Sequence, residues 1–151
     1  MRLVIAGIPG TGKTTIGDYL QKEKGFFHIN LENNPENANF FNDPVSFICA
    51  IESQEQDIVI TWGFIPNEHQ TKLVLLLKER GYQLFWFDGN REAALRAFNK
   101  RGTVSEQAFQ IQIANINSSQ VINLIRPTII NTFGKTGKFR SRAAIVRELN
   151  T

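Results

Sequence analysis

GIPGTGKT, at residues 7–14, satisfies the pattern G-x-x-x-x-G-K-[ST], in which a glycine-rich loop turns its backbone N–H groups toward a chain of phosphates. The apolar run before it, residues 3–6, is typical of a strand that is buried on both faces. After it, apolar side chains at helical spacing predict a helix over residues 13–24, which Gly25 ends. A loop between a buried strand and a helix is the context that the pattern requires.

Each residue type in the loop has a chemical reason. The glycines let the backbone form a concave anion site, and the helix that follows adds unpaired N–H donors. Lys13 would place its charge between the β- and γ-phosphates, Thr14 would offer its hydroxyl to Mg²⁺, and Thr15 would offer one to the α-phosphate. We therefore expect ATP, or a close relative, and Mg²⁺ as cofactors. The expected nucleotide contacts are Gly7, Ile8, Pro9, Gly10, Thr11, Gly12, Lys13, Thr14 and Thr15.

Strand-like and helix-like segments alternate along the rest of the chain. The expected strands are residues 3–6, 26–31, 57–62, 82–87 and 128–133. The expected helices after the first are residues 43–54, 67–80, 91–100, 104–125 and 142–149, and residues 30–42 are expected to form a loop. Alternation of this kind implies right-handed crossovers and a parallel sheet with helices on both faces. We expect a three-layer α/β fold in a single domain over residues 1–151.

The composition fits a folded domain that binds phosphate-bearing ligands. Of the 151 residues, 42% are hydrophobic and 12 are Phe, which supports a packed core. The formal net charge is +3 and the sequence pI is about 9.2, well short of a dedicated nucleic-acid binder. From Arg126 onward, six basic residues stand against the single acid Glu148. This cluster is either a solvated face or a site for a polyanion.

Neither export nor membrane insertion is indicated by the sequence. The apolar run at the N-terminus ends at Ile8, Pro9 and Gly10, which is too short for an export signal, and no stretch approaches the length of a membrane span. The single cysteine, Cys49, excludes an intramolecular disulfide and fits a reducing compartment. It stands in an apolar stretch, so we expect it in the core of a cytoplasmic protein.

Two further stretches carry a family likeness. NPENANFFNDP, residues 34–44, resembles the NP…FY.DP stretch of deoxynucleoside kinases, and ITWGFIP, residues 60–66, stands where adenylate kinases have an Asp-Gly-Phe-Pro turn. Together with the loop, they make the chain resemble the P-loop kinases of nucleosides, nucleotides and other small metabolites, such as shikimate and gluconate. The resemblance implies a five-stranded parallel sheet of order 2-3-1-4-5, a mobile lid after the fourth strand and an adenine-contacting loop after the fifth.

One position departs from this family. Trp62 stands where the adenylate kinases have an Asp, which orients water around Mg²⁺ in that family. Asp88, at the end of the fourth predicted strand, is the candidate metal ligand in its place, and its alternative role is to cap the helix that begins near Arg91. Trp62 and Phe64 would either stack on an aromatic acceptor or pack in the core. His28, in an apolar strand, is expected to be a core residue.

Two cations and one acid join Lys13 as candidates for catalysis. By resemblance, Arg96 and Arg101 belong to a short lid near residues 96–106 and would stabilise the charge that develops during transfer; the alternative is a solvated helix face. Glu32 follows the second strand, where the family often has a carboxylate that takes the proton of the acceptor. The alternative for Glu32 is a place in a surface loop.

The sequence therefore predicts an ATP-dependent phosphotransferase. The expected reaction is Mg²⁺-dependent transfer of the γ-phosphate to a small-molecule acceptor, and a nucleoside or nucleotide is favoured over nucleic acid. A nucleotide-binding regulatory module or slow ATPase is the main alternative, because Trp62 replaces the acid. A polynucleotide end-kinase is the second, because basic residues stand between Lys135 and Arg142.

Overall fold

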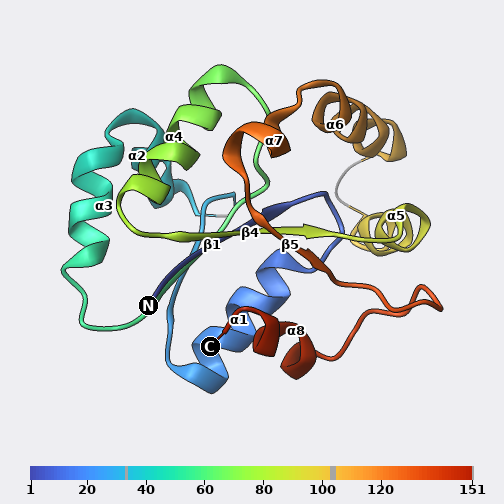
Figure 1. Cartoon of the computed structure of the whole chain (residues 1–151), viewed down its shortest axis with the longest axis horizontal. Helices are drawn as coiled ribbons and strands as arrows, with labels where there is room; N and C mark the ends of the chain where they lie inside the picture. Colours follow the sequence, from blue (N-terminus) through green and yellow to red (C-terminus); the bar gives the residue numbers. More distant parts are fainter. Residues whose placement is uncertain (33, 103–104, 151) are drawn as a thin grey trace.

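A five-stranded parallel sheet runs through the centre of the protein (Figure 1). The computed structural model describes residues 1–32, 34–102 and 105–150. The strands are β1 (Arg2–Gly7), β2 (Phe27–Asn30), β3 (Ile58–Thr61), β4 (Gln83–Asp88) and β5 (Thr128–Asn131). They pair in the order β2-β3-β1-β4-β5, and all of these pairings are parallel. The predicted fold class and sheet order are confirmed.

Helices cover both faces of this sheet (Figure 1). One face carries α1 (Lys13–Lys24) and α8 (Arg142–Glu148), which contact each other. The opposite face carries α3 (Pro44–Glu52), α4 (Glu68–Glu79), α6 (Glu106–Ser118) and α7 (Val121–Ile125). The remaining long helix, α5 (Arg91–Asn99), follows β4 and packs against α6. Among the described residues, none of the helices combines the length and the apolar character needed to cross a membrane.

The alternation of side chains along β1 explains why this strand is apolar throughout. Leu3 and Ile5 lie in the core beneath α1 and α8, whereas Val4 and Ala6 lie in the core on the opposite face. All four side chains are at most 1% exposed. Successive side chains of a strand point to opposite faces, so a strand between two helical layers must be apolar at each position.

Side-chain caps set several helix starts close to where the sequence predicts them. Asp43 caps α3 and Asn67 caps α4, and each accepts a hydrogen bond from a backbone N–H of the first helical turn. At the start of α5 the same role belongs to Asn90. The capping role considered for Asp88 is therefore wrong, because a residue two positions nearer to the helix takes it.

Two of the predicted segments differ in the structure. The loop expected over residues 30–42 contains a 3-10 helix, Pro35–Ala38, which Asn34 caps, and the one-turn helix α2 (Asn39–Asn42). The single helix expected over residues 104–125 is two helices, α6 and α7, because Gln120 between them has a left-handed backbone with φ of 52°. Residue 104 itself lies outside the described residues.

Cys49 is exposed on α3, so its predicted place in the core is wrong. The helix buries Ile48 and Ile51 against the sheet, and the thiol of Cys49 instead lies near the guanidinium of Arg80, with 3.5 Å between sulfur and nitrogen. A short helix with apolar residues on most sides does not reveal from its sequence which side faces the core.

Candidate functional site

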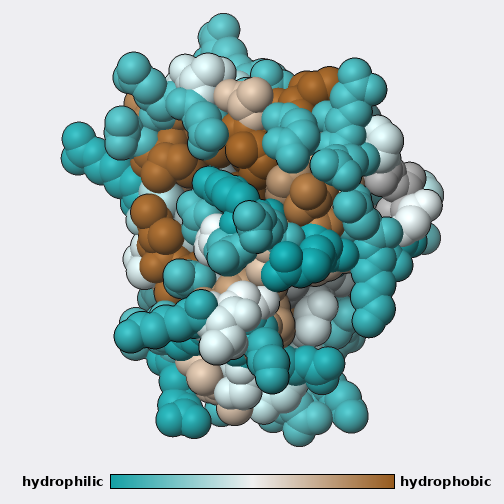
Figure 2. Space-filling model, turned by 90° about the vertical axis from the view of Figure 1, so that its right-hand side faces the viewer, coloured by the Kyte–Doolittle hydropathy of each residue, from teal (hydrophilic) through white to brown (hydrophobic). Residues whose placement is uncertain are grey.

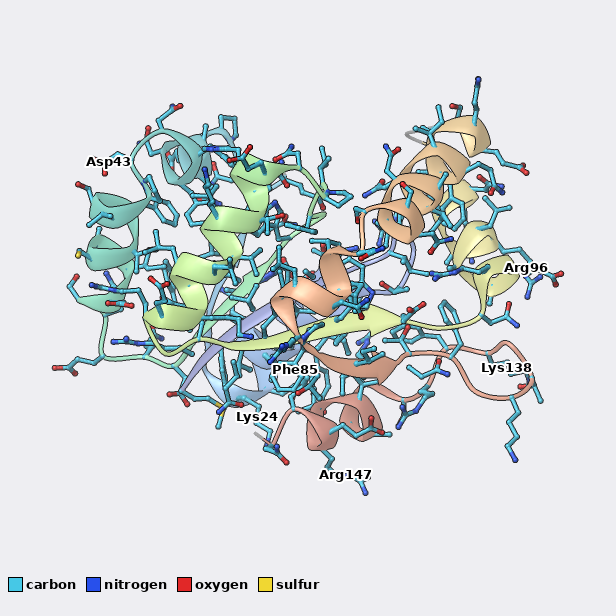
Figure 3. The ribbon with its side chains drawn as sticks, turned by 45° about the horizontal axis from the view of Figure 1, so that its top comes forward. Lys24, Asp43, Phe85, Arg96, Lys138 and Arg147 are labelled. Carbon is cyan, nitrogen blue, oxygen red and sulfur yellow. The ribbon has the colours of Figure 1, made fainter. Side chains whose placement is uncertain are left out.

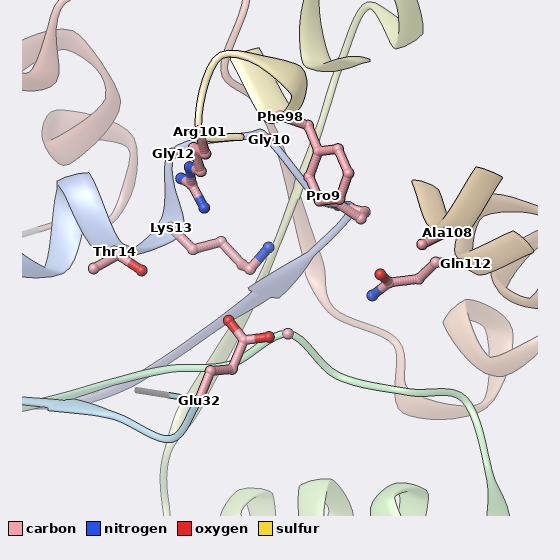
Figure 4. Close-up of a pocket in the computed structure, with 11 residues that line it drawn as sticks. Pro9, Gly10, Gly12, Lys13, Thr14, Glu32, Phe98, Arg101, Ala108 and Gln112 are labelled. Atoms are coloured by element: carbon pink, nitrogen blue, oxygen red, sulfur yellow. The ribbon is translucent and has the colours of Figure 1, made fainter. Parts of the chain in front are cut away.

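A cavity of about 160 Å³ opens where β1 runs into the glycine-rich loop (Figure 4). The loop and the start of α1 contribute Pro9, Gly10, Gly12, Lys13 and Thr14 to its wall. The remaining wall is formed by Glu32, Gly63, Phe98, Arg101, Ala108 and Gln112. Figure 2 views the molecule from the side of α5 and α6, and hydrophobic patches lie there between hydrophilic side chains. The cavity thus joins the loop to residues from distant parts of the chain.

Two glycines of the loop allow close contact with neighbouring backbone. Gly7 and Gly10 have positive φ angles of 143° and 76°. A β-carbon on Gly7 would overlap the backbone of Phe87 in β4, and one on Gly10 would overlap the backbone of Ala94 in α5. Gly7, which the pattern requires, and Gly10, which stands at one of its variable positions, therefore serve close packing as well as the turn itself.

Three of the predicted nucleotide contacts do not expose their side chains to this cavity. Ile8 is fully buried, and the buried hydroxyl of Thr11 donates a hydrogen bond of 2.7 Å to the carbonyl of Ile8. Both residues can offer a nucleotide only their backbone groups. Thr15 lies instead in a separate hollow that also contains Asp18 and Arg142.

Lys13 is buried at the centre of the site. Its side chain is folded back so that Nζ donates to the carbonyl oxygens of Gly7, at 3.2 Å, and Ile8, at 3.0 Å. Burial lowers the pKa of this ammonium group from its ordinary 10.5 to about 8; the charge of Glu32 opposes this shift and that of Arg101 adds to it. An anion that enters the loop would therefore meet a lysine that is short of negative partners.

Glu32 faces Lys13 across the cavity (Figure 4). It stands two residues beyond β2, and its carboxylate lies against Gly63, which follows β3. A β-carbon on Gly63 would overlap Oε1 of Glu32, so this glycine is a condition for the position of the carboxylate. The side chain of Glu32 makes no hydrogen bond with the described residues, so its two oxygens are free for a ligand.

Arg101 approaches the loop from the exit of α5, and its guanidinium points toward Lys13 (Figure 4). The two cations are close enough for Arg101 to help lower the pKa of Lys13. Two adjacent positive charges repel each other in an empty protein, where Glu32 offsets part of the repulsion, and they become favourable around a polyphosphate. The site is therefore built for an anion at its loop end.

The architecture places the chain among known proteins. No protein-family model matches it. Over 98% of its length it is similar to a sugar kinase from Janibacter sp., with a TM-score of 0.63, 16% sequence identity and 91% of that chain covered. Over 97% of its length it is similar to a gluconokinase from Sinorhizobium meliloti, with a TM-score of 0.60, 18% sequence identity and 87% of that chain covered. Over 99% of its length it is also similar to shikimate kinase from Bacteroides thetaiotaomicron, with a TM-score of 0.63, 13% sequence identity and 96% of that chain covered. The fold is that of the P-loop kinases.

A short stretch is also similar in sequence to an enzyme of this fold. Over 29 residues, or 19% of the chain, it is 59% identical to an adenylate kinase from Mycoplasmoides gallisepticum. The matched stretch spans only 14% of the length of that adenylate kinase. The sequence likeness is therefore local, whereas the likeness in fold extends over nearly the whole chain.

Asn30, which the sequence analysis missed, contacts two residues of the cavity wall. At the end of β2, its side-chain amide donates to the hydroxyl of Thr14 at 3.2 Å, and its carbonyl oxygen accepts from the backbone N–H of Glu32 at 3.0 Å. It thus connects the expected ligand of Mg²⁺ to the expected base. The available signal was its place at the carboxyl end of a predicted strand, two residues before Glu32.

Phe98 and Gln112 were also missed. Phe98 is on α5 and lies beside Pro9 of the loop, whereas Gln112 is on α6 and lines the far side of the cavity (Figure 4). Nothing in their local sequence distinguishes them from other helical residues. Only the packing of α5 and α6 beside the loop brings them to the site.

Arg96 lies apart from the cavity wall. Its guanidinium reaches Gly137 in the segment after β5, 3.3 Å from where a β-carbon would stand, and it lies at the same end of the molecule as Lys138 (Figure 3). Of the two arginines predicted for a lid, Arg101 alone lines the cavity. The predicted lid at 96–106 includes residues 103–104, which lie outside the described residues.

Asp88 is engaged locally at the end of β4. Its carboxylate accepts from the backbone N–H of Gly89 at 2.7 Å and pairs with Arg91 at 2.9 Å. It is not part of the cavity wall, so its predicted role toward Mg²⁺ would require it to act from outside.

The residues that do line the cavity fit Mg²⁺ when a nucleotide shares its coordination. No cluster of three or more His, Cys, Asp or Glu side chains within the described ranges could hold a metal by itself. Mg²⁺ in kinases takes one or two protein oxygens together with phosphate oxygens and water. The hydroxyl of Thr14 supplies a protein oxygen of this kind, and phosphate oxygens and water would supply the others.

Trp62 and Phe64 belong to the core and are not available for stacking. Trp62 is 2% exposed, Phe64 is fully buried, and the two rings meet edge-to-face with centroids 5.5 Å apart. Phe40 and Trp86 extend this aromatic contact on either side. Of the two roles considered for these side chains, core packing is the one observed.

His28 is a satisfied core residue, as the sequence predicted. Its Nε2 lies 2.8 Å from the hydroxyl of Thr61 and its Nδ1 lies 3.0 Å from the carboxylate of Asp18. Burial lowers the pKa of the imidazole, while Asp18 opposes the shift. Thr61 is 1% exposed, so this chain of hydrogen bonds does not reach the cavity.

The segment after β5, where the resemblance places an adenine-contacting loop, touches the glycine-rich loop directly. The ring of Phe139 lies against Gly12, at the position that a β-carbon would occupy. It also meets Phe133 edge-to-face, with centroids 5.7 Å apart.

In the basic cluster of this segment, Arg140 pairs with Glu148, so this arginine has a structural role.

Proposed function

We propose that the protein is a Mg²⁺-dependent kinase that transfers the γ-phosphate of ATP to a hydroxyl group of a small molecule. The observation that carries this proposal is the joint placement of Lys13, Arg101 and Glu32 around one cavity. A loop that only binds a nucleotide needs the lysine and its backbone N–H groups. A second cation and a free carboxylate opposite them are what phosphoryl transfer to an acceptor requires in addition.

Each side chain has a role in this reaction. Glu32 takes the proton from the acceptor hydroxyl while the hydroxyl oxygen bonds to the γ-phosphorus, and the bond from that phosphorus to the β–γ bridging oxygen breaks to leave ADP. Lys13 and Arg101 stabilise the negative charge on the transferred group and on the leaving oxygen. Thr14 holds Mg²⁺, which when bound neutralises part of the phosphate charge, and Asn30 orients the Thr14 hydroxyl.

The acceptor class expected from the sequence, a nucleoside or nucleotide, stays within the proposal. The burial of Trp62 and Phe64 removes the base-stacking argument for it. Gluconate and shikimate, the acceptors named for two similar structures, are therefore tested beside nucleosides and sugars. The cytoplasmic location and the single-domain organisation with a short lid stay predictions.

A regulatory module or slow ATPase is the second candidate. The observation that favours it is the scarcity of acids at the expected metal position, where Asn30 contacts Thr14 and Trp62 lies in the core. Under this hypothesis ATP binds, but no small molecule accelerates its cleavage. For an end-kinase acting on nucleic acid, the basic cluster is reduced by one residue, because Arg140 pairs with Glu148.

The test is ADP release with a panel of nucleosides, nucleotides, sugars, sugar acids and shikimate. We expect at least one acceptor to raise the rate well above that of ATP alone. Glu32→Gln should abolish the increase while ATP still raises the melting temperature, because ATP binding adds about 2.7 kcal/mol at a hundredfold excess over Kd. The matched control is Glu36→Gln, which makes the same change at an exposed position outside the cavity and should keep the parent rate.

A panel without any stimulating acceptor would replace the kinase proposal with the regulatory module. Stimulation that survives Glu32→Gln would leave the kinase but remove Glu32 as its base.

A further inference from the structure

The two chain segments that face the loop across the cavity contain no cations. Residues 25–71, which contribute Glu32 and Gly63, contain no Lys or Arg but seven acids: Glu32, Glu36, Asp43, Glu52, Glu55, Asp57 and Glu68. Residues 102–125, which contribute Ala108 and Gln112, also contain no Lys or Arg. Of these acids, Glu32 is the one that lines the cavity, so in a chain with 17 basic residues this wall carries one acid and no cation.

The positive charges of the cavity lie together at its loop end. Lys13 and Arg101 approach each other beside Thr14, whereas Gln112 projects from the opposite wall (Figure 4). A bound triphosphate would occupy both cations. What is left for a second ligand is Glu32, Gln112 and an apolar surface formed by Phe98 and Ala108.

The two polar side chains that remain have unused hydrogen-bonding capacity. Neither the carboxylate of Glu32 nor the amide of Gln112 makes a side-chain hydrogen bond with the residues that the structure describes. A carboxylate only accepts hydrogen bonds, and an amide both accepts and donates them. Hydroxyl groups satisfy this pair fully, because each can donate to Glu32 and accept from Gln112. A second carboxylate or a phosphate would instead face the charge of Glu32 without a cation.

We propose that the acceptor site takes a hydroxyl compound without negative charge, uncharged or cationic, and rejects carboxylates and phosphate esters. This inference rests on the proposed kinase function and deepens it, since it favours sugars, amino sugars and nucleosides over sugar acids and nucleotides. Glu32 accepts a hydrogen bond from the reacting hydroxyl, and Gln112 hydrogen-bonds a second polar group of the ligand. Phe98 and Ala108 contact the apolar face of the ligand.

The test measures acceptor binding to the protein loaded with Mg²⁺ and a non-hydrolysable ATP analogue, by ligand-observed NMR. The compounds are matched sets that differ mainly in charge: glucose, glucosamine and glucuronate, and adenosine with AMP. We expect the uncharged or cationic member of at least one set to bind at least tenfold more tightly than its anionic counterpart. Tighter binding of an anionic member, or no binding by any member of either set, overturns the inference.

A variant with an added positive charge tests the same idea from the protein side. Gln112→Arg places a cation opposite Glu32 and should raise the binding of glucuronate relative to glucose at least tenfold. Gln110→Arg adds the same charge to α6 at an exposed position outside the cavity, so it should leave the preference unchanged. An equal shift in both variants would mean that the charge of the whole protein, not the cavity, sets the preference, and would overturn the inference.

Binding and turnover together separate this inference from the proposed function. If an uncharged compound binds selectively but no compound stimulates ADP release, the inference about the acceptor site stands and the proposed kinase function is refuted. If ADP release is stimulated most by gluconate or AMP, the proposed kinase function stands and the inference about the acceptor site is refuted.

Discussion

Raising the pH should weaken ATP binding through a single side chain, Lys13. In the unliganded protein, burial lowers the pKa of its ammonium group to about 8. Phosphates around the ammonium favour its protonated form, so the pKa of Lys13 in the ATP complex lies above that of the free protein. Affinity is therefore fully present below pH 8 and is lost as the pH rises above 8, because binding must then protonate the amine.

The size of the effect follows from the two protonation states. At pH 9, one unit above the free pKa, about one molecule in eleven has a charged lysine, so ATP should bind roughly tenfold more weakly than at pH 7. Each binding event at pH 9 should also take up about 0.9 proton, provided that the lysine is charged in the complex. The phosphates of ATP are fully ionised above about pH 7.5, so they add no protons in this window.

Calorimetry at pH 7.5, 8.5 and 9.5, in buffers with different ionisation enthalpies, measures both the affinity and the proton uptake. Lys13→Arg is the control, because a guanidinium stays charged throughout this range and its affinity should not change with pH. Constant affinity in the unchanged protein would refute the reasoning. So would an equal loss of affinity in the Lys13→Arg variant.

Three other substitutions test the geometry of the site. Gly10→Ala should lower the free energy of unfolding by roughly 2–4 kcal/mol in urea titrations, because it adds backbone overlap to left-handed strain, whereas Gly81→Ala, with open space around it, should cost only about 1–2 kcal/mol. Gly63→Ala should displace the carboxylate of Glu32 and reduce acceptor-stimulated ADP release about 100-fold, while the ATP-induced shift in melting temperature stays unchanged. A normal rate of ADP release would show that the position of Glu32 does not matter for catalysis. Arg101→Ala should reduce kcat about 100-fold and ATP affinity much less, and the opposite pattern in steady-state kinetics would make it a binding residue.

The features that depend on neighbouring residues were predictable from the sequence. The pattern at residues 7–14 identified the loop, because its glycines, lysine and threonine act within a few residues of one another. The predicted helix over residues 13–24 matches α1, because Gly25 stops it with a positive φ of 73°. Alternating strands and helices gave the layered sheet. Each of these depends on backbone preference or local spacing.

The composition of the acceptor end was decided by the tertiary structure. Gln112 stands about 100 residues from the loop, and only the packing of α5 against α6 brings it to face Glu32. Periodicity also did not reveal that Trp62 is buried by an aromatic cluster, or that Cys49 lies on the outer side of α3. The break between α6 and α7 at Gln120 was not predictable, because no Gly or Pro stands at this position. The sequence by itself predicted a phosphate-binding loop, because the residues that form such a loop are neighbours in the chain. The charge and shape offered to the proposed acceptor depend instead on helices that meet only in the folded protein.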